Sequence, residues 1–162
     1  MIYRFRVILD NDTEDNIFRD IEIKDNSTFE DLHYTIINYF NLDGKELAAF
    51  YISNDNWEQG EEIVLDGFNE NNQILMNKTN LKTIINKNQK KFIYVYDFLK
   101  LWTFFVEIFE ISEGKKNSVY PKNIFSNGDL PSEAPEKQFI AQENEDSIED
   151  KDLDYNNFDD YY

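Results

Sequence analysis

A change of hydrophobic periodicity near the start of the chain most constrains its fold. Residues 2–9 place Tyr3, Phe5 and further large apolar side chains at every second position, and residues 17–24 alternate in the same way. A period of two is typical of strands with one buried face. Because a short polar stretch joins the two segments, together they predict a β-hairpin.

The period then lengthens to that of a helix. From Phe29 to Phe40 apolar residues recur at steps of three and four, which is typical of an amphipathic helix. Ser27 and Glu30 have the spacing of a capping box in front of it, and Asp43-Gly44 predicts its end. A hairpin, a helix and a following strand predict an α+β fold with a ββαβ start. One main helix would pack on a mixed or antiparallel sheet, with a β-grasp-like arrangement as one form of this fold.

Later segments are expected to extend the sheet. Residues 47–53 and 62–65 predict two strands, and residues 79–85 predict a short helical turn. Residues 92–98 and 101–111 are rich in aromatic and β-branched side chains and predict a second hairpin. Both faces of this hairpin are apolar, so we expect it at the centre of the sheet or against a partner. Beyond it, glycine, proline and asparagine predict loops.

The end of the chain has a different composition. The protein of 162 residues has a formal net charge of −17, and residues 143–162 alone hold nine carboxylates against the single Lys151. Such a segment buries too little apolar surface to offset the entropy lost on ordering. We therefore predict an α+β domain over residues 1–138 and an acidic, aromatic-containing tail over residues 139–162 that is disordered when free.

Composition argues against several functions. The chain has no cysteine, a single histidine, no Walker sequence and no Gly-x-Ser-x-Gly. It therefore lacks the residues from which zinc sites, phosphate-binding loops and nucleophile elbows are built. We predict no cofactor, no metal and no catalytic residue. No apolar stretch reaches the roughly 20 residues that span a bilayer, and the lack of cysteine fits a reducing compartment. A cytoplasmic protein that does not bind membranes is expected.

Several segments together resemble a known family. They are Thr28-Phe29-Glu30-Asp31-Leu32-His33, Phe50-Tyr51-Ile52, and Tyr94-Val95-Tyr96-Asp97-Phe98 followed by Trp102 and Phe104-Phe105-Val106-Glu107. With Tyr120-Pro121 and Leu130-Pro131-Ser132-Glu133, they are similar to the plasmid ORF-3-like family, named from a root-inducing plasmid and often labelled as insertion-element passenger or TnpR-like proteins. The segment from Tyr94 to Glu107 looks like the branch found in Bacteroidota, whose members tend to carry acidic tails. The resemblance covers residues 2–135 and implies an α+β fold with no established activity.

The chain departs from the family pattern at several polar positions. Many members follow the Tyr-Asp-Phe with Gly-Asp-Asp-Trp and a histidine, whereas this chain has Leu-Lys-Leu-Trp and then Phe104. The family helix is usually followed by a tryptophan and a His-Leu pair, where this chain has Leu42, Glu46 and Leu47, and a Pro-Pro-Glu-Asp run survives only as residues 130–133. A His-dependent metal or acid-base site of the family would be mostly lost here.

The favoured functional hypothesis is a non-catalytic protein-interaction module, an accessory component of a larger cytoplasmic assembly. The acidic tail is expected to bind a basic protein surface, and nucleic-acid machinery is one such partner because spaced carboxylates can mimic phosphates. Aromatic and aliphatic side chains would act as anchors. The expected contacts are Trp57, Trp102 and Phe104 in the domain and Ile148, Leu153, Asp154, Tyr155, Phe158, Asp159, Asp160, Tyr161 and Tyr162 in the tail.

Two alternatives stay open at this point. A degenerate enzyme or metal-binding protein of mobile-element origin would use His33, Glu46 and Asp97. His33 lies on the apolar face of the predicted helix, where a hydrogen-bonded structural histidine is the commoner case.

The second alternative is weak, direct binding of nucleic acid. It would need Arg4, Arg6, Arg19 and Lys24 to form one patch. The negative overall charge disfavours it, because such a surface repels phosphate.

Overall fold

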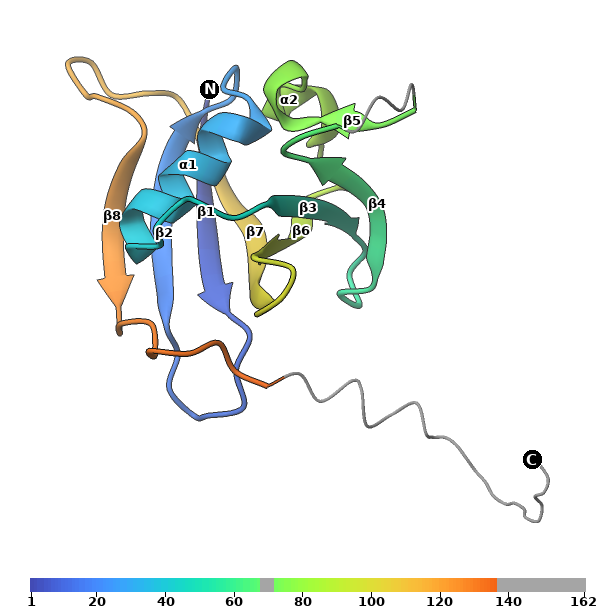
Figure 1. Cartoon of the computed structure of the whole chain (residues 1–162). Helices are drawn as coiled ribbons and strands as arrows, with labels where there is room; N and C mark the ends of the chain where they lie inside the picture. The colour runs from blue at the N-terminus through green and yellow to red at the C-terminus, as the bar shows by residue number, and fades with distance from the viewer. Residues whose placement is uncertain (68–71, 137–162) are drawn as a thin grey trace, which may run out of the picture.

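The computed structural model describes residues 1–67 and 72–136. One long strand pair, one main helix and a curved sheet dominate the arrangement (Figure 1). In chain order the elements are β1 (Ile2–Leu9), β2 (Phe18–Lys24), α1 (Phe29–Phe40), β3 (Ala48–Ser53), β4 (Gln59–Val64), β5 (Ile74–Leu75), the 3₁₀ turn η1 (Met76–Lys78), α2 (Leu81–Ile84), β6 (Lys91–Tyr96), β7 (Trp102–Ser112) and β8 (Lys122–Asn127).

The strands of the described residues form one mixed sheet in the order β5-β4-β3-β6-β7-β1-β2-β8. All neighbours are antiparallel except β4 and β5. The predicted α+β class, with one main helix on the sheet, is confirmed, and the β6–β7 hairpin lies at the centre as its two apolar faces predicted. The expected ββαβ start is present as β1, β2, α1 and β3. Within the sheet β3 lies between β4 and β6, and β1 lies between β2 and β7.

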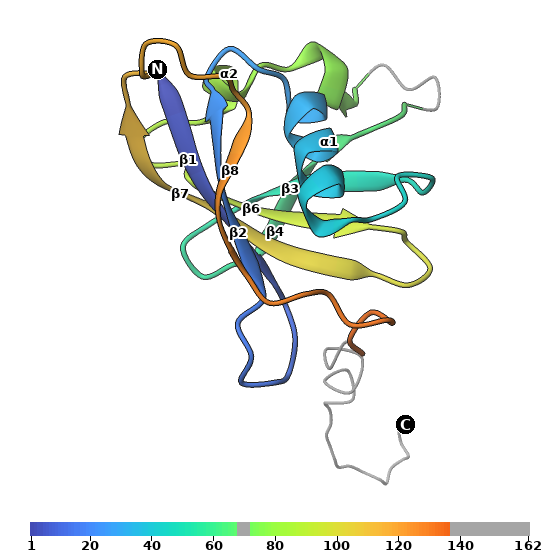
Figure 2. The same cartoon turned by 90° about the vertical axis from the view of Figure 1, so that its left-hand side faces the viewer.

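The core lies between α1 and one face of the sheet (Figure 2). Phe29 of α1 packs edge-on against Phe50 and Phe92, and Phe40 packs against Phe104 at a ring-centroid distance of 4.8 Å. Burying large aromatic side chains supplies most of the stabilisation of such a core. The alternate side chains of the strands lie on the opposite face, where Arg6, Tyr51 and Phe105 are half-buried or exposed and Ile93 and Val95 are buried.

The helix begins one residue later than its capping pattern predicted. Thr28 accepts a hydrogen bond from the Asp31 amide, and the Asp31 carboxylate accepts one from the Thr28 amide. Ser27 instead connects neighbouring elements, because its amide donates to Lys24 and its carbonyl accepts from the Leu81 amide. The motif and its spacing were predicted correctly, but tertiary hydrogen bonds set the register.

The last strand was missed. β8 pairs with β2, although its sequence, Lys-Asn-Ile-Phe-Ser-Asn, has little alternation and was assigned to a loop. An edge strand is held mainly by backbone hydrogen bonds to one neighbour and needs no buried face of its own. The other missed strand, β5, has only two residues, and β4 begins earlier than predicted, at Gln59.

Candidate functional site

One candidate site is a cleft at the C-terminal end of α1, which we call the helix-end cleft. It lies where the end of α1, the β6–β7 turn and the segment after β8 meet, and its volume is about 620 Å³. Its lining residues are Arg19, Phe40, Asn41, Leu42, Asp43, Glu46, Tyr96, Asp97, Leu99, Lys100, Trp102, Asp129, Leu130, Pro131 and Ser132.

One wall of the cleft is fixed by Tyr96 at the end of β6. Its hydroxyl donates a short hydrogen bond to the Asp43 carboxylate and accepts hydrogen bonds from the amides of Lys45 at 3.0 Å and Glu46 at 3.3 Å. The hydrogen bond from Tyr96 lowers the pKa of the Asp43 carboxyl. Burial and this same bond raise the pKa of Tyr96. Asp43 is therefore held as an ionised carboxylate at the rim.

The β6–β7 turn forms a second wall and has an unusual backbone. Asp97 and Leu101 have φ angles of 66° and 58°, in the left-handed region that non-glycine residues seldom occupy. The Asp97 carboxylate holds the turn by accepting hydrogen bonds from the amides of Leu99 at 3.0 Å and Lys100 at 3.2 Å. The turn presents Leu99 to solvent with 94% of its surface exposed. Strained backbone of this kind clusters at functional sites.

Arg19 joins three segments beneath the cleft and is only 5% exposed. Its guanidinium donates to the carbonyls of Tyr39 at 2.9 Å, Phe18 at 2.9 Å and Gly128 at 2.8 Å, and lies 4.7 Å from the ring centroid of Phe40. Burial lowers the pKa of Arg19. Through these hydrogen bonds Arg19 links the segment after β8 to the end of α1.

The cleft carries more negative than positive charge. Four carboxylates, of Asp43, Glu46, Asp97 and Asp129, line it against the cations of Arg19 and Lys100. Four carboxylates against two cations favour an ammonium or guanidinium group over an anion. They do not form a metal centre, since within residues 1–67 and 72–136 no three His, Asp or Glu side chains are grouped so as to hold an ion.

Comparison with protein families gives one match. The family described as plasmid pRiA4b ORF-3-like protein matches residues 1–154. The chain belongs to this family. The ORF-3-like match extends past residue 138, so the predicted boundary between domain and tail at that point stays a prediction.

A solved structure has the same fold as this ORF-3-like chain. The crystal structure of MM3350, a protein of unknown function from Methanosarcina mazei Go1, superposes with a TM-score of 0.68 at 24% identity, over 77% of this chain and 68% of that one. At this identity the likeness concerns the fold alone. A search of curated proteins gives no match. Among the described helices, none is long and apolar enough to cross a membrane.

Several segments in which the sequence departs from the family pattern line the helix-end cleft. Leu42 and Glu46, after the helix, and Leu99, Lys100 and Trp102, after the Tyr-Asp-Phe, line it, as does the start of the remaining Leu130-Pro131-Ser132-Glu133 run. In the sequence these segments are far apart. The fold therefore brings several of these departures from the family pattern together at one cleft.

The structure separates the three residues of the predicted enzyme alternative. Glu46 and Asp97 line the helix-end cleft, whereas His33 is buried in the core with 1% exposure and its Nδ1 lies 2.7 Å from the Tyr94 hydroxyl. Burial lowers the pKa of His33 to about 4. The proposed imidazole-carboxylate cluster does not form, because the apolar face of α1 carries His33 into the core.

The three predicted anchors of the domain also separate. Phe104 is fully buried and packs on Phe40, and Trp102 is 8% exposed. Neither is therefore the freely exposed anchor that the sequence predicted. Trp57 is half-buried on the opposite face of the sheet, 4.8 Å from the ring of Phe105. It borders a shallow groove of about 330 Å³. Alternation in β7 decides this outcome, because Trp102 and Phe104 point to the helix side.

The basic patch needed for direct nucleic-acid binding is absent from the predicted positions. Arg19 is buried on the helix side, while Arg6 on the opposite face forms two hydrogen bonds with the buried Asp20, at 2.8 and 2.9 Å. Arg4 pairs with Glu110 at 3.4 Å and Asp20 at 3.7 Å. Lys24 lies at the far end of β2.

The predicted contacts of the tail lie outside the described residues. These are Ile148, Leu153, Asp154, Tyr155, Phe158, Asp159, Asp160, Tyr161 and Tyr162. Within the domain, the sequence did not predict the groups that build the cleft. These are Arg19, which links its segments, the Tyr96–Asp43 pair and the exposed Leu99. The Asp43-Gly44 sequence was the one local signal near them.

Proposed function

We propose that this chain is a non-catalytic protein-interaction module that binds a basic, partly apolar segment of a protein partner. The observation that carries the proposal is the helix-end cleft, where an acidic cavity adjoins an apolar turn held out into solvent. Leu99, at 94% exposure, supplies apolar contact area. The partly exposed Phe98 precedes it in the chain, and the partly exposed Leu47 lies beside the turn, where its carbonyl accepts a hydrogen bond from the Asp97 amide. Exposed apolar side chains beside polar groups are typical of interaction sites.

The chemistry of the cleft favours one kind of guest. Asp43 and Glu46 lie at the rim and Asp97 deeper, so a lysine or arginine side chain entering the cleft meets carboxylates along its length. The rings of Phe40, Tyr96 and Trp102 line the same space and suit the aliphatic stem of such a side chain. Leu99 would enter an apolar depression on the partner.

The acidic tail supports the same kind of partner. The described chain ends at Glu136, four residues after Ser132 of the cleft lining. Residues 143–162, with nine carboxylates and one lysine, are attached to this point of the chain through six further residues. A partner with a basic surface would interact with both, with an association rate that falls steeply as salt rises. A component of nucleic-acid machinery is one partner with this property.

Absence of catalysis is part of the proposal and rests on the chemistry of the groups available. The buried His33, with its pKa near 4, is neutral at pH 7 and sealed from solvent. The cleft carboxylates have no histidine, cysteine or lysine nucleophile hydrogen-bonded to them in the described residues. In the part of the chain that the structure describes, the one hydroxyl hydrogen-bonded to a cleft carboxylate is that of Tyr96, and its raised pKa makes it a poor nucleophile.

The test uses the full chain and a defined probe. A fluorescent peptide of alternating lysine and leucine is titrated with the wild type, with Leu99→Ser, and with Asp43→Asn combined with Glu46→Gln. Val119→Ser serves as the matched control, since Val119 is an apolar residue, 81% exposed, on the β7–β8 loop. We expect each cleft variant to weaken binding about tenfold, as loss of an anchor or of charge complementarity does, and the control to bind like the wild type.

Two further arms decide the outcome. A glutamate-leucine peptide of the same length should not bind. In capture from cells, the basic peptide should displace partners from the wild type and from Val119→Ser, and the two cleft variants should fail to capture those same partners. Equal affinity of the wild type and both cleft variants for the basic peptide would reject the helix-end cleft as the binding site.

A further inference from the structure

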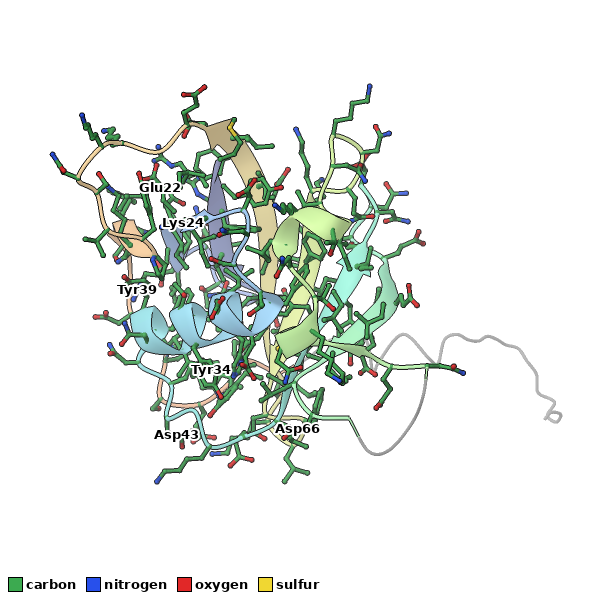
Figure 3. The ribbon with its side chains drawn as sticks, turned by 90° about the horizontal axis from the view of Figure 1, so that it is seen from above. Glu22, Lys24, Tyr34, Tyr39, Asp43 and Asp66 are labelled. Atoms are coloured by element: carbon green, nitrogen blue, oxygen red, sulfur yellow. The ribbon has the colours of Figure 1, made fainter. Side chains whose placement is uncertain are left out.

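The end of the molecule opposite the helix-end cleft carries a second, basic concavity, which we call the basic hollow. It lies where the start of β1, the end of β2 and the β7–β8 loop meet, with a volume of about 530 Å³. The N-terminus and this loop lie together at the top of Figure 1, and Lys24 and Asp43 lie on opposite sides of α1 in the view of Figure 3. The two concavities therefore belong to different ends of the sheet.

Three lysines make the hollow positive in a chain of net charge −17. Lys24, Lys115 and Lys116 line it and are exposed, and none of their ammonium groups forms an ion pair with a residue of the described ranges. The single carboxylate of the lining, Asp25, pairs with the Met1 amine at 3.4 Å. The hollow is thus a place where cations lack counter-ions.

The hollow also has an apolar component. Ile2 and Tyr120 line it, and the Tyr120 hydroxyl accepts a hydrogen bond from the Lys115 amide at 3.1 Å, which holds the loop against the ring. A guest that combines carboxylates with aromatic or aliphatic side chains would match both features.

We propose that the acidic tail of the chain itself, within residues 143–162, binds the basic hollow. Its nine carboxylates are interleaved with Ile148, Leu153, Tyr155 and Phe158, which is the combination that the hollow accepts. The inference does not need the helix-end cleft to bind anything. If the tail binds the basic hollow of its own chain, any basic partner must compete with the hollow for the tail.

Reach and tethering support a contact within one chain. The described fold ends at Glu136, and the strands that separate the two ends of the sheet have six to eight residues, or about 25 Å at the rise of a strand. The 26 residues from 137 to 162 span up to about 85 Å when extended. A tethered segment acts at an effective concentration of about a millimolar, which favours it over a separate molecule at low protein concentration.

The experiment couples neighbouring lysines and carboxylates with a zero-length carbodiimide reagent in the dilute full chain. We expect cross-links from Lys24, Lys115 and Lys116 to acidic residues of 143–162. Lys24→Gln/Lys115→Gln keeps the Lys116 amine as the reporting group, and the yield of the Lys116 cross-link should fall about fivefold, since two of the three lysines of the hollow are lost. It should fall likewise in high salt.

A matched variant separates a site from general attraction. Lys78→Gln/Lys82→Gln removes the same charge from exposed lysines of η1 and α2, and we expect it to keep the Lys116 cross-link. Equal loss in both variants, or cross-links spread evenly over all lysines, would show long-range attraction without a site and overturn the proposal. Mixing isotope-labelled and unlabelled chains tests the intramolecular claim, because cross-links between the two labels would assign the hollow to the tail of a second copy.

Discussion

The helix-end cleft and the basic hollow lie toward opposite ends of β2, and their charged groups are held in different ways. In the cleft, Arg19 is buried under three backbone carbonyls, and the Asp43 carboxylate is fixed by Tyr96. In the hollow, Lys115 and Lys116 are exposed on a loop without ion pairs to described residues. The cleft is thus part of the folded core, whereas the hollow is a feature of surface charge.

This difference has a general meaning for stability and binding. Groups that hold a fold together lose much when they are replaced, because each leaves buried partners unsatisfied. Exposed charges contribute little to stability and act on ligands at a distance. Substitutions at the two ends should therefore separate cleanly in unfolding experiments.

The largest effect is expected at Arg19. Arg19→Met should lower the free energy of unfolding by about 3 kcal/mol, because it removes a buried guanidinium and leaves three part-buried backbone carbonyls without this donor. Urea unfolding followed by circular dichroism measures it. Lys100→Met is the control, since Lys100 is an exposed cation of the same cleft, and it should change stability by less than about 0.5 kcal/mol. If Arg19→Met is equally harmless, the cleft is not tied to the core.

A second effect of similar size is expected from His33, which lies in the core and belongs to neither end. Its folded-state pKa of about 4 is below the ordinary value of 6.5, so the unfolded chain takes up a proton at a pH where the folded chain does not. Stability from this group is present above pH 6.5 and is lost as the pH falls from there toward 4, by up to about 3 kcal/mol.

The pH effect is isolated by comparing the wild type with His33→Gln in urea unfolding at a series of pH values. The difference between the two should change with pH in this window, while the binding of the basic peptide by folded protein stays equal. A parallel decline in both proteins would mean that carboxylates alone cause the pH dependence.

The smallest effect is expected at the hollow. Lys24→Gln/Lys115→Gln/Lys116→Gln should change the free energy of unfolding by less than about 0.5 kcal/mol, because these side chains are exposed and have no ion pairs with described residues. The same urea titration measures it. A loss of stability comparable to that of Arg19→Met would show that the basic hollow, like the helix-end cleft, contributes to holding the fold together.

Much of the fold could be predicted from local patterns. The alternation in residues 2–9 and the helical spacing from Phe29 to Phe40 specified β1 and α1 with their observed bounds, because one buried face per element imposes the period. β8 could not be predicted, since the edge strand is held by backbone pairing with β2. The cap of α1 was shifted by one residue because Ser27 bonds to Lys24 and Leu81 instead.

The candidate site was less predictable than the fold. The family-like segments around Leu42, Asp97 and Leu130 were recognised one by one, but nothing in their spacing shows that they meet at one cleft. Aromatic residues are common in interfaces, which predicts Trp102 and Phe104 as anchors, whereas their strand register turns them inward. His33, taken in one alternative as a catalytic group, was carried into the core by the helix face that the sequence itself predicted.

The sequence by itself determined the class of the fold, the buried faces of β1 and α1, the excess of negative charge and the acidic composition of residues 143–162. These follow from composition and from periods of two and 3.6 residues, which act within one element. Only the tertiary structure decided that Arg19 lies under the helix end, that Tyr96 holds Asp43, and that Lys24 meets Lys115 and Lys116. Such encounters depend on strand order and register, which join residues up to a hundred positions apart and leave no mark in the local sequence.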